Sequence, residues 1–328
     1  MKLIALENAL VDYTAYVNDD FLANYRLLKG SFNPITAGMK EAMEKSLQAV
    51  KSSGGSAANV CHGFANLGLF ASFIASAGND ENADFYEQEL TQAGIVPYIE
   101  RKSGDTGVCM ALITPDKERT LAVNMGESSS LQPEDIMEER FAGSAIFHTS
   151  AYALDSMYPA VLRAMDFAKK HNVKVSFELA SVKSIQMHRD TIKYLLENYV
   201  DIVFANEEEA EEFTGKAPLQ AIKELDRKAI AVVKLGGKGA IIGQPTSQIH
   251  VYGGGAKTME MLVPSYKASA VKNTNGAGDA FAAGFLYGIV KGYNIYKAGK
   301  IGAFYAAKVV EVESARLPYR ISDIEKLI

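Results

Sequence analysis

Residues 273–285, NTNGAGDAFAAGF, join a glycine-rich turn to an apolar segment. Large apolar residues recur every four positions from 281 to 289, which predicts a helix that begins near residue 277. The first amides of a helix have no intrahelical acceptor and lie at the positive end of its dipole. We therefore expect the amides of three residues to be open to a phosphate group: Gly276, Ala277 and Gly278.

Asp279 follows directly at the mouth of this turn. A carboxylate at that place would face a hydroxyl group that attacks a bound phosphoryl group, and it could accept the hydroxyl proton. Because phosphoryl transfer depends mainly on positioning and charge stabilisation, one base and one anion-binding turn form a sensible minimal site. The alternative is that Asp279 only caps the helix. The segment alone leaves both readings open.

Two other phosphate-binding patterns are not matched. The sequence contains no GxxxxGK[ST] loop, because GGKGA at 236–240 lacks a hydroxyl residue after its lysine. A GxGxxG dinucleotide fingerprint also fails, since Phe281 takes the place of the third glycine. P-loop enzymes and dinucleotide-dependent reductases are thus disfavoured.

The surrounding pattern alternates short Val/Ile/Phe-rich runs with longer amphipathic stretches, which is typical of a parallel sheet covered by helices on both faces. We expect strands near 2–7, 71–77, 145–149, 173–177, 201–205 and 229–235, and helices near 56–67, 82–93, 158–171, 184–198, 206–214, 277–292 and 295–311. The fold class is therefore a doubly wound α/β domain. Leu10–Val17 and Ile95–Val123 break the alternation, which indicates either a small β-rich lid or an antiparallel extension of the main sheet.

Composition limits the classes of partner. The 328 residues are 48% hydrophobic and carry a formal charge of -5, with no long basic run, so we expect no nucleic-acid binding. Only two cysteines occur, Cys61 and Cys109, which suits a reducing compartment. No stretch approaches 18 apolar residues, so we expect a cytoplasmic protein that does not enter a membrane.

Together, NTNGAGDAF and GGSAANVCHGFANLG (54–68) resemble the two signatures of the ribokinase (PfkB) family of carbohydrate and nucleoside kinases. Within it, ENALVDYTAYVNDDFLANY, ERTLAVNMGE and NEEEAEEF look most like adenosine kinases. The resemblance spans essentially the whole chain. It implies one ribokinase-like domain over 1–328, with a lid formed by about 10–35 and 95–125, and an ATP- and Mg²⁺-dependent kinase.

By the same resemblance, Asp279 is the general base, the 276–278 amides form the anion hole, and Arg119 lies over the transferred phosphate. The sugar would be bound by Asp12, Gly54, Gly55 and Asn59, and a nucleobase by Asn8 and Tyr152. For Gly54 and Gly55 the alternative is an ordinary tight turn, and for Asp12 a solvated strand end. For Tyr152 it is ordinary packing at a strand end, and for Arg119 an exposed turn.

On the nucleotide side, the resemblance implies roles for Asn206, Lys234, Gly236 and Gly239, with Glu209 holding magnesium through water. The competing reading of Glu209 is an acidic first helical turn, and Lys234 could either hold a phosphate or point into solvent. Asn273 replaces the aspartate that usually heads this signature, which puts activation by a monovalent cation in doubt.

The resemblance implies transfer of the ATP γ-phosphoryl group to a primary hydroxyl of a small molecule. We expect a purine nucleoside, with a pentose or hexose as the alternative within the family. A non-catalytic nucleoside- or sugar-binding protein is the alternative of another class. Both a monomer and a homodimer are compatible with the sequence.

Overall fold

The computed structural model describes residues 2–245 and 259–328. Nine strands form a large sheet in the order β14-β13-β12-β11-β10-β9-β1-β5-β6. All neighbouring pairs from β12 to β6 are parallel, and β13 and β14 add an antiparallel edge. The bounds are β1 Lys2–Leu6, β5 Phe70–Ala77, β6 Ile95–Arg101, β9 Ser144–Ser150, β10 Lys174–Glu178, β11 Ile202–Asn206, β12 Ile230–Lys234, β13 Ala240–Gln244 and β14 Met259–Val263.

Helices cover both faces of this sheet, because its strands are apolar on both sides. In β1, Leu3 and Ala5 belong to one buried cluster while Ile4 and Leu6 belong to the other. The first cluster contains α3 (Ser56–Asn66), α4 (Glu81–Gln92), α9 (Ala277–Val290) and α10 (Ile295–Val309). The second contains α5 (Leu154–Lys170), α6 (Val182–Asn198), α7 (Glu207–Thr214) and α8 (Pro218–Leu225).

The strand order reverses between β1 and β9. From β1 the chain proceeds outward to β5 and β6, whereas β9 to β12 proceed in the other direction. In open α/β sheets, ligands bind at the carboxyl ends of the strands beside such a reversal. The residues that follow β1 and β9 are therefore placed where a ligand site is expected.

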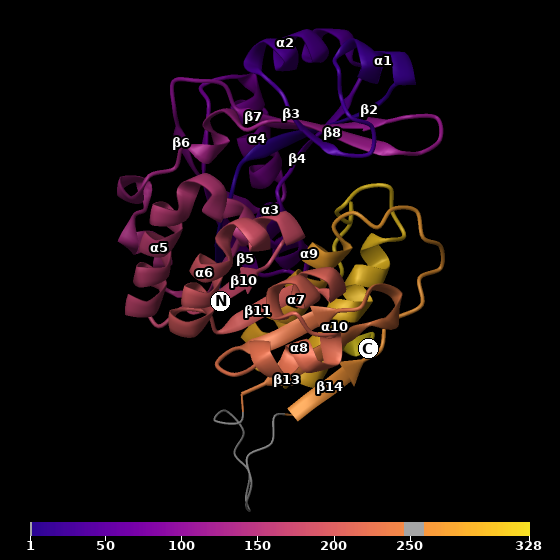
Figure 1. The fold of residues 1–328 in the computed structure, drawn as a ribbon. Coiled ribbons are helices and arrows are strands. Elements are labelled where there is room, and N and C mark those ends of the chain that lie inside the picture. Colours follow the sequence, from indigo (N-terminus) through magenta and orange to yellow (C-terminus); the bar gives the residue numbers. More distant parts are fainter. Residues whose placement is uncertain (1, 246–258) are drawn as a thin grey trace, which may run out of the picture.

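A second, five-stranded sheet lies at one end of the body, and α1 (Asp19–Asn24) and α2 (Ala37–Ser46) lie over it (Figure 1). Its order is β3-β8-β7-β2-β4. The strands are β2 Leu10–Tyr16, β3 Phe32–Pro34, β4 Val50–Ser53, β7 Gly107–Ile113 and β8 Arg119–Asn124. Together with α1 and α2, the small sheet is therefore built from two separate stretches of the chain, 10–53 and 107–124.

The predicted doubly wound fold is confirmed, and so are the expected helices and strands of the large sheet. One part of the lid expectation needs correction: Ile95–Arg101 is β6 and pairs in parallel with β5 in the large sheet. It follows α4 after a short turn, and such a strand–helix–strand unit returns beside its first strand. Because no helix follows β6, its sequence pattern looked like that of the small sheet. No helix in the described ranges is long and apolar enough to cross a membrane.

Candidate active site

The turn before α9 leaves backbone amides available. Gly276 is left-handed, with φ 74°, and α9 has no side-chain cap. Within the described part of the chain, the amides of Gly276 and Gly278 have no hydrogen-bond acceptor, whereas the Ala277 amide donates to the Thr274 carbonyl at 3.2 Å. Two of the three expected donors are thus open. The third has a local partner.

The Asp279 carboxylate is held by the start of α3. Its Oδ1 accepts a hydrogen bond from Ser56 Oγ and its Oδ2 accepts one from Asn59 Nδ2, each at 2.7 Å. Burial raises the pKa of Asp279, and the bonds from Asn59 and Ser56 oppose that rise. The carboxylate therefore reaches across to another helix instead of capping its own.

Both the nitrogen and the oxygen of the Asn59 side-chain amide are bonded within the protein. While Nδ2 donates to Asp279, Oδ1 accepts from Arg316 Nε at 2.8 Å. Arg316 Nη1 in turn donates to Ser53 Oγ at 2.6 Å. Asn59 was expected to bind substrate hydroxyls, but this geometry makes it a support for Asp279. Sequence reasoning missed Arg316, because it comes from a segment near the C-terminus that no motif marks.

Gly54 and Asp12 are adjacent, as the resemblance implied. A Cβ atom at Gly54 would collide with the Asp12 carboxyl group, and Gly55 has φ 100°, so both positions require glycine. Burial raises the pKa of Asp12 to about 6, and Arg316 and Arg119 oppose the rise. Asp12 stands in β2, opposite Ser52 of β4, so the small sheet supplies this carboxylate.

Glu7 follows β1 directly, at the reversal of strand order, and its side chain lies beneath the start of α3. Sequence reasoning did not single it out. Its carboxylate accepts from the backbone amides of Ser56 at 3.1 Å and Ala57 at 3.0 Å, and from Ser150 Oγ at 2.8 Å. Burial raises the pKa of Glu7 to about 7. Its only sequence signal was a polar residue directly after a buried strand. Glu7 thus fixes the helix that holds Asp279.

The two residues expected at a nucleobase differ in availability. Asn8 is buried, and its Nδ2 donates to the Ser128 carbonyl at 3.0 Å. Tyr152 follows β9 in a short turn, Ala151–Ala153, and is 41% exposed, with its hydroxyl donating to the Ala180 carbonyl at 3.1 Å. The tyrosine side chain is therefore partly accessible, while one N–H of the Asn8 amide is already bonded.

Arg119 connects the small sheet to the glycine turn. It begins β8, it is exposed, and its Nη1 donates to Asn275 Oδ1 at 2.8 Å. Asn273 shapes the same turn, since its Oδ1 accepts from the Asn275 amide at 2.9 Å and its Nδ2 donates to the Glu313 carbonyl at 2.7 Å. A guanidinium group therefore lies next to the open amides.

A cavity of about 710 Å³ opens on the other side of the turn. Lys234, Gly236 and Gly239 line it, as expected for the nucleotide side, together with Gly278. Its apolar wall is formed by Val271, Phe281, Ala303, Ala306, Ala307 and Val310. An apolar wall together with several glycines and two lysines, Lys234 and Lys267, suits a flat base linked to phosphates.

Lys234 points inward, which answers the question that the sequence left open. Its side chain is 14% exposed, its ammonium group pairs with Glu178, and a Cβ atom at Gly278 would lie 2.9 Å from its Nζ. Burial lowers the pKa of Lys234, but Glu178, Glu209 and Asp279 together raise it, so the lysine is charged. Glu178, at the carboxyl end of β10, was not singled out from the sequence.

Asn206 and Glu209 form a capping box at the start of α7. The Glu209 carboxylate accepts hydrogen bonds from the backbone N–H of Asn206 at 2.9 Å and from the side-chain Nδ2 of Asn206 at 2.7 Å. Among the described residues no three His, Cys, Asp or Glu side chains converge as a metal site. However, Glu178 Oε2 is buried and has no hydrogen-bond partner among the described residues. These carboxylates fit a magnesium ion that keeps its waters and is carried by phosphates.

Comparisons with known proteins identify the family of the chain. The sequence profile of the "pfkB family carbohydrate kinase" matches residues 29–321. The 5-dehydro-2-deoxygluconokinase of Bacillus subtilis is 29% identical, with 87% of this chain and 89% of the relative aligned. The guanosine-inosine kinase of Escherichia coli is 28% identical over 67% of this chain and 54% of that protein. The structure of adenosine kinase from Sinorhizobium meliloti has a TM-score of 0.84 and 27% identity, covering 97% of this chain and 96% of that one.

Proposed function

Since the chain belongs to the pfkB family of carbohydrate kinases, and is thus a phosphotransferase that acts on an alcohol group, we propose a specific acceptor and base. The acceptor is a primary hydroxyl of a purine nucleoside, and Asp279 is the general base. The observation that carries this proposal is the position of Asp279 between α3 and the turn whose amides are open. In the proposed reaction, the acceptor oxygen attacks the γ-phosphorus of ATP, its proton passes to Asp279, and ADP leaves. The open amides and Arg119 then bear the charge on the transferred group.

The geometry around Asp279 supports its role as a base. Ser56 and Asn59 donate to one oxygen each, so the carboxylate is oriented yet retains lone pairs for an incoming hydroxyl. Its pKa is raised by burial, which makes it a stronger proton acceptor than an exposed aspartate. These two features fit a positioned base.

A purine nucleoside is favoured by the exposed ring of Tyr152 beside the reversal of strand order. Aromatic faces stack on bases, which a free sugar does not need. The Asp12 carboxylate in the small sheet could accept from two neighbouring ribose hydroxyls. The occupied Asn8 amide weighs in the other direction, as does the alignment with the 5-dehydro-2-deoxygluconokinase over most of the chain. A pentose or hexose is therefore the second candidate acceptor.

Kinases of this family use ATP and Mg²⁺, and we propose the same for this chain. The 710 Å³ cavity would hold the nucleotide, with Lys234, Gly236 and Gly239 along its phosphates. Magnesium would supply positive charge between the phosphates. Glu209 and Glu178 would hold its waters, and Asn206 would orient Glu209.

We propose that the small sheet acts as a lid, because it carries Asp12 and Arg119 to the site from outside the large sheet. Its closure would exclude water from the reaction. Hydrogen exchange of 107–124 with and without acceptor tests this idea. Equal protection in both states would contradict a lid.

A screen of purine nucleosides, pentoses and hexoses for ADP release, with ATP and Mg²⁺, tests the acceptor. We expect the highest kcat/KM for a purine nucleoside. To assign that preference to the ring, Tyr152→Leu should raise KM for the nucleoside and leave KM for ATP unchanged. A sugar that outperforms every nucleoside, with no effect of Tyr152→Leu, would reverse the order of the two candidates.

A further inference from the structure

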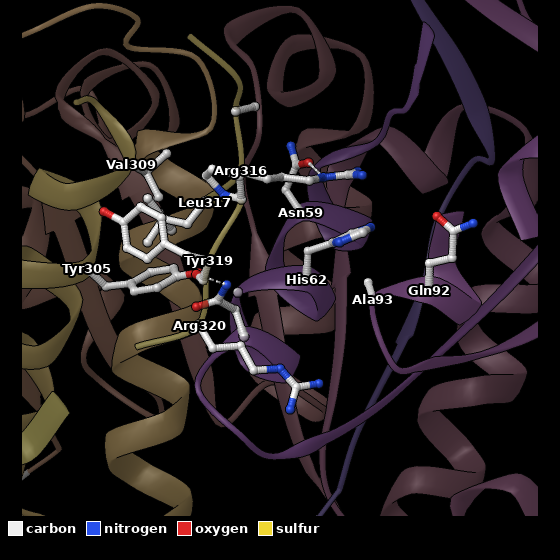
Figure 2. A pocket seen from close by; sticks show the side chains of 15 residues that line it. Asn59, His62, Gln92, Ala93, Tyr305, Val309, Arg316, Leu317, Tyr319 and Arg320 are labelled. Atoms are coloured by element: carbon white, nitrogen blue, oxygen red, sulfur yellow. Dashed lines mark hydrogen bonds between the residues drawn. The ribbon is translucent and has the colours of Figure 1, made fainter. Parts of the chain in front are cut away.

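A second cavity, of about 180 Å³, lies between α3, the end of α4, α10 and the segment 315–320. Figure 2 shows its lining, with Arg316, Asn59 and His62 around one part and Tyr305, Tyr319 and Arg320 around another. The cavity shares no lining residue with the proposed nucleotide site. Asn59, which holds Asp279, lines the cavity, but none of the residues proposed to contact the acceptor or the phosphates does.

The lining of this cavity is basic. Its 15 residues include Arg316 and Arg320 but no aspartate or glutamate, and His62 among them is neutral because burial lowers its pKa. This is unusual for a chain whose 39 acidic residues outnumber its 34 lysines and arginines. A small basic cavity in an acidic protein attracts anions rather than cations.

Two nitrogen atoms in the lining lack partners. Arg316 Nη2 and His62 Nε2 are buried, and no hydrogen-bond partner exists for either within residues 2–245 and 259–328. Their side chains point to the same side of the cavity, toward Gln92 (Figure 2). Buried donors without partners are rare in folded proteins, so these atoms indicate a missing acceptor.

The Arg316 guanidinium is fixed in this orientation. Its Nε donates to Asn59 Oδ1 at 2.8 Å and its Nη1 to Ser53 Oγ at 2.6 Å. Glu89 lies 3.9 Å from Nη1, on the side of the group that is already bonded. The remaining nitrogen, Nη2, is therefore the one presented to the cavity, as in sites where arginine binds oxyanions.

We propose that this cavity binds a small oxyanion, a carboxylate or a phosphate, through Arg316 Nη2 and His62 Nε2. A neutral imidazole can donate from Nε2 when its proton resides there. Arg320 and Gln92 line the cavity as further donors. The bound anion would be connected to Asp279 by three hydrogen bonds in series, through Arg316 and Asn59.

The test is a titration of the full chain with sodium acetate and with inorganic phosphate, followed by NMR of ¹⁵N-labelled histidine. The chain has five histidines, and His62→Phe assigns the resonance. We expect the His62 Nε2 signal to shift and to saturate with at least one of the two anions. Acetate alone indicates a carboxylate ligand, and phosphate alone a phosphate ligand. No shift with either anion would refute the proposal.

Variants separate this cavity from the active site. Arg316→Gln should abolish the saturable shift, while the other histidine signals report whether the variant is folded. The exposed Arg320→Gln should weaken binding roughly twofold to fivefold, and the equally exposed Arg227→Gln should not change it. Lys234→Gln should leave the shift intact. If Lys234→Gln abolishes it, or Arg316→Gln retains it, the anion acts from elsewhere and the proposal fails. This readout does not depend on kinase activity.

Discussion

The starts of α9 and α7 show two opposite uses of a helix N-terminus. The α7 start is closed by its own side chains, because Asn206 and Glu209 bond each other's backbone and side chain. The α9 start has a left-handed glycine and no side-chain cap, and the Gly276 and Gly278 amides are without acceptors among the described residues. One helix satisfies its own amides, and the other leaves them for a ligand.

The carboxylates differ in the same way. Glu209 bonds back to its own helix start, whereas Asp279 bonds to Ser56 and Asn59 of α3. A carboxylate near a helix start can therefore be a cap or a reactive group. The partner that holds it distinguishes the two roles.

The largest expected effect is that of Asp279→Asn. Its amide cannot take the proton of the attacking hydroxyl, so we expect kcat to fall roughly 10²- to 10⁴-fold while nucleoside and ATP still bind. Turnover assays and calorimetric titration measure the two effects separately. Asp190→Asn, an exposed aspartate, is the matched control and should behave as the parent. If Asp279→Asn turns over at the parental rate, Asp279 has only a structural role and is not the general base.

Gly278→Ala should have the next largest effect. The new Cβ atom would lie 2.9 Å from the flexible end of Lys234, so the fold can adjust while the approach to the open amides is obstructed. We expect kcat/KM for ATP to fall roughly tenfold to a hundredfold, less than for loss of an oxyanion donor. Gly38→Ala, in open space on α2, is the control. A silent Gly278→Ala would mean that these amides do not face the phosphates.

Glu7 presents an intermediate case. It lies at the end of β1 and accepts hydrogen bonds from the first backbone amides of α3, which is far from it in sequence. Its folded-state pKa of about 7 lies above the ordinary 4.5, so the folded protein binds the extra proton between those values and stability falls as pH rises through that window. Glu7→Gln removes this penalty. Relative to the parent, we expect the variant to gain about 2 kcal/mol of unfolding free energy from pH 5 to pH 8.

Urea unfolding at the two pH values measures this gain. The absolute stability of Glu7→Gln at one pH is not the readout, because glutamine also changes the bonds to Ser56 and Ala57. An equal difference from the parent at both pH values would show that Glu7 titrates normally.

The smallest effects are expected at α7. Asn206→Ala removes the cap and should cost about 1 kcal/mol in urea unfolding. Glu209→Gln should retain stability, because glutamine also serves in a capping box. If Glu209 helps to hold magnesium, this variant raises the Mg²⁺ concentration needed for half-maximal turnover. An unchanged Mg²⁺ requirement would leave Glu209 as a cap alone.

Much of the fold could be predicted, because apolar periodicity directly reports strands and helices buried on both faces. The assignment of Ile95–Arg101 failed because a strand at the edge of the large sheet has no following helix to mark it. The antiparallel strands β13 and β14 and the short strand β4 escaped for a similar reason. Local pattern does not reveal which sheet a short strand joins.

For the site, glycine spacing located the open turn, and family resemblance supplied Asp12, Tyr152 and Lys234. The supporting groups were not predictable. Glu7, Glu178 and Arg316 meet the site only through tertiary contacts with residues at least 49 positions away in sequence. Sequence also could not show that the Asn8 and Asn59 amides are already bonded, because hydrogen-bond partners are chosen by packing.

The small sheet and the two helices over it come from 10–53 and 107–124, and the chain between these two stretches forms α3, β5, α4 and β6 of the body. No single cut would release it as an independent module. Moving the small sheet to another protein would require two segments to be spliced in together. The small sheet therefore depends on the folded body to bring its two segments together.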